Sequence, residues 1–151
     1  MEPQRPTLAA SIGLLILRLG VGGYMLSHGW GKLQMLIAAD FESFADPIGI
    51  GKAPSLVGVV LAEFLCSALV MIGLFTRLAA IGPVFAMGVA AFVFHADDPW
   101  FMGQGPASKE PALLFLIPFL ALVFTGAGCI SLDALIFRRG PQSTSPTGAT
   151  M

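Results

Sequence analysis

Four apolar segments of 17 to 21 residues dominate the 151-residue chain. They run from about residue 8 to 27, 55 to 75, 78 to 94 and 111 to 129. A helix needs roughly 20 apolar residues to cross the hydrocarbon core, whereas a membrane strand needs only about 10 that alternate in polarity. These segments do not alternate, so the sequence predicts an all-α fold, a four-helix transmembrane bundle.

The composition excludes the other broad classes of protein. Apolar residues make up 56% of the chain and charged residues 11%, against roughly 25% charged in soluble domains. A soluble domain of this size cannot bury so much apolar surface. The net charge of −1 leaves no basic surface for nucleic acid, and Cys66 and Cys129 are too few for a disulfide scaffold. We therefore expect an integral membrane protein in contact with the lipid bilayer.

The connections between the apolar segments divide the chain further. Apolar residues recur at helical spacing from Leu33 to Phe44, which predicts a short amphipathic helix in the membrane interface between helices one and two. After Arg138 and Arg139 the chain becomes rich in Pro, Ser, Thr and Gly. The predicted domains are thus a membrane domain at 1–135 and a disordered tail at 136–151.

Positive charges in the short connections predict the orientation. With four spans, both termini share one side with the turn at 73–77, and this side carries Arg5, Arg77, Arg138 and Arg139. The other side carries Lys32, Lys52 and Lys109, together with six acidic residues. Because the arginines collect with the termini, we expect a multi-pass protein of the inner membrane with both termini in the cytoplasm.

Two ionisable residues fall deep inside predicted helices, Arg18 in the first and Glu63 in the second. An ionisable group in a membrane helix is costly unless it is paired. Arg18 precedes His28 by ten residues and Glu63 follows Pro54 by nine, which places the two at similar depths. We therefore predict an Arg18–Glu63 ion pair, which either polarises a site or only fixes the register of the helices.

Further polar groups collect at the same membrane side as the ends of these helices. His28 and Lys32 end helix one, His95 ends helix three, and Glu110 begins helix four. Aromatic residues surround them, among them Trp30 and Trp100. An apolar pocket with a few convergent polar groups is typical of a small-molecule site.

Two histidines and a carboxylate near neutral pH suit proton transfer to a lipophilic molecule such as a quinone. His28, His95 and Glu110 are therefore candidate catalytic residues, and the candidate cofactor-binding residues are Arg18, Glu63, Lys32, Trp30 and Trp100. The histidines lack the spacing of a helical metal motif, so no metal ligands are assigned. A metal held through tertiary contacts, a bis-histidine haem and simple contact with lipid headgroups remain alternatives.

The ordered series of motifs over residues 10 to 135 resembles the DoxX family. The series is Leu-Arg-Leu-Gly at 17–20, His28-Gly29-x-x-Lys32, Glu63, Gly-Leu-Phe-Thr-Arg at 73–77, His95, Glu110 and Ser-Leu-Asp at 131–133. The resemblance implies a four-helix membrane bundle. It also implies redox work in the membrane, since the family takes its name from subunits of thiosulfate-oxidising, quinone-reducing complexes and includes members linked to thiol stress.

We therefore expect a redox-associated membrane subunit that binds a quinone or similar lipophile and works with a soluble oxidoreductase partner. The chain has neither a CxxC motif nor a nucleotide motif, so we expect it to hand electrons or protons to a partner and not to complete electron transfer alone. One alternative is a non-catalytic scaffold that docks an enzyme. Another is a small-molecule transporter, which would require a homo-oligomer because four short helices enclose little space.

Overall fold

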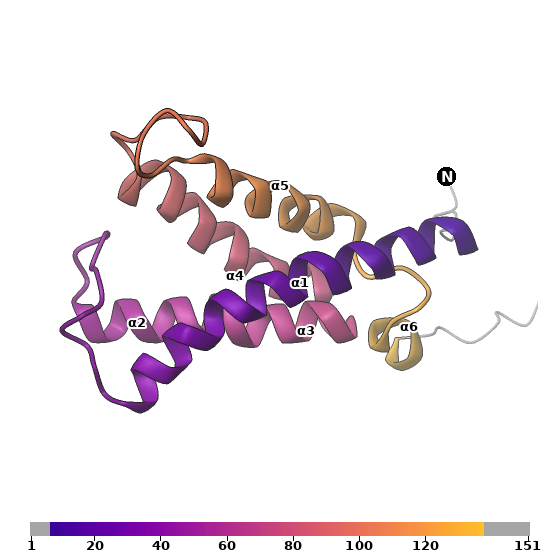
Figure 1. Ribbon diagram of the computed structural model, residues 1–151. Coiled ribbons are helices and arrows are strands. Elements are labelled where there is room, and N and C mark those ends of the chain that lie inside the picture. Colours follow the sequence, from indigo (N-terminus) through magenta and orange to yellow (C-terminus); the bar gives the residue numbers. More distant parts are fainter. Residues whose placement is uncertain (1–6, 138–151) are drawn as a thin grey trace, which may run out of the picture.

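The computed structural model describes residues 7–137 as a bundle of helices with no strand in this range (Figure 1). The first helix is α1, Leu8–Ile37. The second is continuous from Lys52 to Ile72 and consists of α2 (Lys52–Val60), the π-helical turn η1 (Leu61–Leu65) and α3 (Cys66–Ile72). The third consists of α4 (Thr76–Val89) and the π-helical turn η2 (Ala90–Phe94), and α5 (Glu110–Thr125) and α6 (Leu132–Ile136) follow. The predicted all-helical fold is confirmed.

Length and composition make three of these helices able to cross a membrane: Leu8–Ile37, Lys52–Ile72 and Thr76–Phe94. The fourth apolar helix, α5, has only 16 residues, about 24 Å at 1.5 Å per residue. It ends before the predicted limit of residue 129 because the chain turns at Gly126, whose φ of 74° is unfavourable for other residues. Large apolar side chains are exposed along these helices, such as Phe85 and Phe124, as expected for a protein that contacts lipid.

The helices run alternately up and down, so the bundle has two distinct ends (Figure 1). We call the end that holds the 38–51 and 95–109 connections the mouth end, and the end that holds α6 and the start of α1 the terminal end. α4 packs mainly on α5, and α1 crosses the second helix. Buried apolar side chains from α1, α3, α4, η2 and α5 form one core: Met25, Val70, Ala79, Ala80, Met87, Ala91, Ala112, Phe119 and Leu122.

The predicted interfacial helix between helices one and two is wrong. Leu33 and Ile37 belong to the last two turns of α1, and residues 38–51 contain turns and bends without a helix. The amphipathic spacing continues the first helix, because no proline separates His28 from Ile37 and α1 runs on through Gly29 and Gly31. α1 ends where Ala39 takes a left-handed conformation, with φ of 54°.

At the terminal end, α6 holds the start of α4 in place. The two carboxylate oxygens of Asp133 accept hydrogen bonds from the backbone N–H groups of Phe75 and Thr76, at 2.7 and 3.0 Å. A carboxylate at a helix N-terminus satisfies free N–H groups and favours the helix dipole. Of the predicted tail at 136–151, Ile136 is the last residue of α6, and residues 138–151 lie outside the described part of the chain.

Candidate functional site

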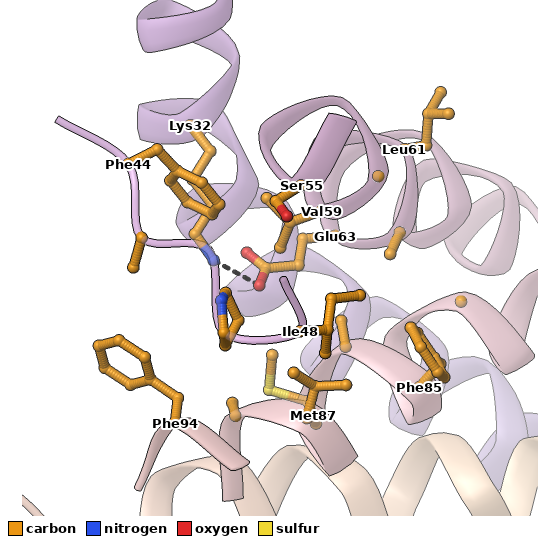
Figure 2. A pocket seen from close by; sticks show the side chains of 18 of the residues that line it. Lys32, Phe44, Ile48, Ser55, Val59, Leu61, Glu63, Phe85, Met87 and Phe94 are labelled. Carbon is orange, nitrogen blue, oxygen red and sulfur yellow. Dashed lines mark hydrogen bonds and ion pairs between the residues drawn. The ribbon is translucent and has the colours of Figure 1, made fainter. Parts of the chain in front are cut away.

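A cavity of about 560 Å³ opens between the second and third helices at the mouth end, and the 38–51 segment closes one side of it (Figure 2). Its walls are almost entirely apolar and include Ile48, Val59 and Phe85. The ionisable side chains that line it are Lys32, Glu63, His95 and the thiol of Cys66. A cavity of this size, apolar with a few polar groups, falls in the range of small-molecule sites. We call it the Glu63 cavity.

Glu63 pairs with Lys32 inside this cavity. Lys32 Nζ lies 2.5 Å from Glu63 Oε1, and the dashed line in Figure 2 marks this contact. The Glu63 side chain is 1% exposed, whereas that of Lys32 is 30% exposed. Within residues 7–137 the second carboxylate oxygen, Oε2, is buried and has no hydrogen-bond partner. A buried acceptor without a partner is costly, so a hydrogen-bond donor brought to this oxygen would stabilise the site.

Both π-helical turns of the structure lie on the walls of the cavity. Glu63 is the central residue of η1, and His95 directly follows η2. A π-helical turn holds one residue more than an α-helical turn allows, and such turns are frequent at functional sites. The extra residue changes which side chains face the cavity on either side of the turn. Sequence periodicity alone does not reveal these turns.

The predicted Arg18–Glu63 ion pair is wrong. The Nη2 atom of Arg18 donates instead to the carbonyl oxygen of Ile130, at 2.5 Å, near the terminal end. The predicted depth of Arg18 takes His28 as the end of the first helix, but α1 continues to Ile37. Counted from the mouth end, Arg18 lies about 28 Å from Ile37 along α1, whereas Glu63 lies about 16 Å from Lys52 along the second helix. Lys32, one of the predicted site residues, takes the place of Arg18.

His95 is held by Asp98 in the connection that follows η2. Its Nδ1 lies 2.7 Å from Asp98 Oδ2. Lys109 fixes this connection by donating to the carbonyl oxygens of Ala96 and Asp98, each at 2.7 Å. Asp98 was missed as a site residue in the sequence, where it counted only as a loop charge. The spacing of three positions between His95 and Asp98 was the feature of the sequence that could have indicated this contact.

The 38–51 segment is anchored to the second helix through Asp46. Its carboxylate accepts from the Ser55 hydroxyl at 2.7 Å and from the backbone N–H groups of Ile50 and Gly51 at 3.1 and 2.7 Å. The bond from Ser55, supported by the backbone bonds, holds the pKa of Asp46 below its usual range. This anchor keeps the apolar residues of the segment, such as Ile48, against the cavity.

The other predicted site residues lie outside the Glu63 cavity. His28 packs edge-on against Phe115, with ring centroids 5.5 Å apart. Glu110 accepts from the backbone N–H of Met102 at 2.8 Å. Phe115 and Met102 in turn line a second apolar crevice, between α1 and α5.

The two predicted tryptophans are half-exposed and also lie away from the cavity. Trp30 packs on Phe64, and Lys109 Nζ lies 5.2 Å from the centre of the Trp100 ring. The structure thus brings together Lys32, Glu63 and His95 from the predicted set and separates them from the others. Among the described residues, no group of three or more His, Cys, Asp or Glu side chains is placed to hold a metal ion.

Comparison with known proteins gives two similarities. The family model described as DoxX matches residues 13–96, which include Lys32, Glu63 and His95. The chain is 33% identical over 141 residues to an uncharacterized protein of Haemophilus influenzae, and the alignment covers 92% of this chain and 98% of that protein. No solved structure matches the chain.

Proposed function

Because the chain belongs to the DoxX family of membrane proteins, and the matched region holds Lys32, Glu63 and His95 of the Glu63 cavity, we propose that this cavity binds a lipophilic small molecule of the quinone type. The observation that carries the proposal is the free Oε2 atom of Glu63, buried in an otherwise apolar cavity. An apolar molecule whose polar head carries a hydrogen-bond donor, as the reduced form of a quinone does, would fill the cavity and satisfy this oxygen.

The polar groups at the cavity fit the chemistry of such a molecule. The Lys32 ammonium lies at the cavity, and His95 is oriented by Asp98, an arrangement that keeps a histidine ready to exchange a proton. Reduction of a quinone takes up two electrons and two protons. The residues of this chain would bind the molecule and move protons, and a soluble oxidoreductase at the membrane surface would supply the electrons.

Replacing His95 by glutamine should weaken the binding of a short-tailed quinol on the order of tenfold, since it removes the imidazole acceptor from the cavity. The measurement is the Kd of the purified protein in nanodiscs, with unchanged melting as evidence of folding. His28→Gln is the matched control, because His28 lies outside the cavity. If the wild-type protein binds neither the quinol nor the quinone, the scaffold alternative is favoured instead.

We further propose that both termini are cytoplasmic, with the mouth end on the outer side of the inner membrane, because arginines collect near the termini. In a background without native cysteines, Gln104→Cys should react with a membrane-impermeant maleimide in intact cells. Ser145→Cys should react only after the membrane is broken. The opposite pattern would reverse the orientation.

A further inference from the structure

The hydrogen-bonding groups of the Glu63 cavity point to the chemical class of its occupant. We propose that the cavity selects a neutral, hydroxyl-bearing amphiphile, and that it therefore binds a quinol more tightly than the corresponding quinone. This inference rests on the proposed function, and it adds which redox form the cavity favours.

Glu63 has an unused capacity to accept a hydrogen bond. A carboxylate only accepts hydrogen bonds. One of its oxygens is held by Lys32 at 2.5 Å, and the other is buried without a partner among residues 7–137. A hydroxyl group donates to such an oxygen in a strong, charge-assisted bond. A quinone carbonyl brings only lone pairs, which the carboxylate repels.

His95, which lines the same cavity, has its tautomer set by Asp98. Its Nδ1 faces Asp98 Oδ2 at 2.7 Å, and an ionised carboxylate requires the proton on Nδ1. In the neutral imidazole the remaining ring nitrogen, Nε2, is then an acceptor. With His95 neutral, Glu63 and His95 thus offer two acceptors, and the two hydroxyl groups of a quinol are the matching donors.

The shape and charge of the remaining cavity wall favour an apolar tail. Small and apolar residues of α4 and η2, from Gly82 through Ala86 to Ala90, line the cavity over about 12 Å of helix. An apolar tail fits along this wall. A phospholipid headgroup does not fit the polar end, since its phosphate would meet the free carboxylate oxygen, and Lys32 is already paired with Glu63.

The test compares three ligands with the same short tail: the quinol, the quinone and the dimethyl ether of the quinol, which carries no donor. Binding to the full-length protein is measured in nanodiscs without oxygen. A hydrogen bond to a charged group is worth about 1.5–3 kcal/mol, so we expect the quinol to bind at least about tenfold more tightly than either other ligand. A tenfold preference corresponds to a rise of about 30 mV in the reduction potential of the bound couple.

The Glu63→Gln variant should reverse the preference. Lys32 donates to whichever oxygen it faces, so it would hold the amide oxygen and turn the amide NH₂ toward the cavity, where it donates to a quinone carbonyl. Unfolding alone would lower the affinity for both ligands and could not reverse their order. Ser67→Ala is the matched control, since Ser67 is buried one turn away and does not line the cavity.

The outcomes separate this inference from the proposed function. If none of the three ligands binds the wild-type protein, the proposed function fails. If all three bind with equal affinity, the function stands and the selection of the hydroxyl form is wrong. Should Glu63→Gln fail to fold, the comparison of the three ligands on the wild-type protein still decides the matter.

Discussion

Replacing Lys32 by methionine should destabilise the protein by about 3–5 kcal/mol, the cost typical of breaking a buried ion pair from one side. The change would leave the carboxylate of Glu63, 1% exposed, without its cation. The converse change, Glu63→Gln, should cost less, because the Lys32 side chain is 30% exposed and its ammonium can reach water or headgroups. Denaturant unfolding in mixed micelles measures both changes.

Two further variants control this comparison. Lys52→Met removes a partner of the exposed Glu42 and should cost at most about 1 kcal/mol, as for other surface pairs. The double variant Lys32→Met with Glu63→Met should recover much of the lost stability, since no charge is left unpaired. Equal stability of Lys32→Met and the wild-type protein would contradict the ion pair.

Replacing Gly29 by alanine should destabilise the protein by about 3 kcal/mol, at the upper end of the cost of overpacking. A Cβ atom at Gly29 would lie 2.7 Å from the backbone nitrogen of Phe64 and 2.9 Å from the carbonyl carbon of Glu63. Backbone atoms cannot turn aside as a side chain can, so α1 would have to move away from η1. The same movement would pull Lys32 from Glu63, and ligand binding should weaken together with stability.

Gly31→Ala is the matched control on the same helix. A Cβ there would meet nothing within 4 Å, and alanine favours a helix over glycine by roughly 0.5–1 kcal/mol. Gly31→Ala should therefore leave stability unchanged or raise it slightly. Melting curves of both variants in the same detergent provide the measurement, and equal melting temperatures would show that α1 and η1 are not in close contact at Gly29.

The sequence was sufficient to predict the helical class and the regions of the apolar helices, because long apolar runs have few other stable arrangements. It failed at the ends of helices. α1 continues to Ile37, and this difference in length changed the depth assigned to Arg18 and with it the partner of Glu63. Periodicity indicates which face of a helix a residue occupies. Which residues of two neighbouring helices lie at the same depth in the bundle depends on where each helix ends.

The sequence also identified the polar residues of the cavity as candidates, but not which of the candidates lie together in one site. Lys32, Glu63 and His95 were all candidates, yet His28 and Glu110 satisfied the same criteria and lie outside the cavity. Helical position alone could not separate these residues, since all sit near the mouth end. The 38–51 segment and the contacts of Asp98 decide the grouping, and both depend on tertiary structure.

Because of the two π-helical turns, the architecture of the cavity depends on how many residues each turn contains as well as on which residues they are. Removing one residue from η1 would allow the second helix to continue as a regular α-helix, with the segments on either side keeping nearly their present faces and the side chains within the turn changing theirs. Glu63, at the centre of η1, would then lose its present position between Lys32 and the cavity wall. Grafting the three polar side chains onto an ideal four-helix scaffold would accordingly not rebuild this cavity, and a single-residue gap near residues 61–65 in an aligned relative would mark a differently shaped site.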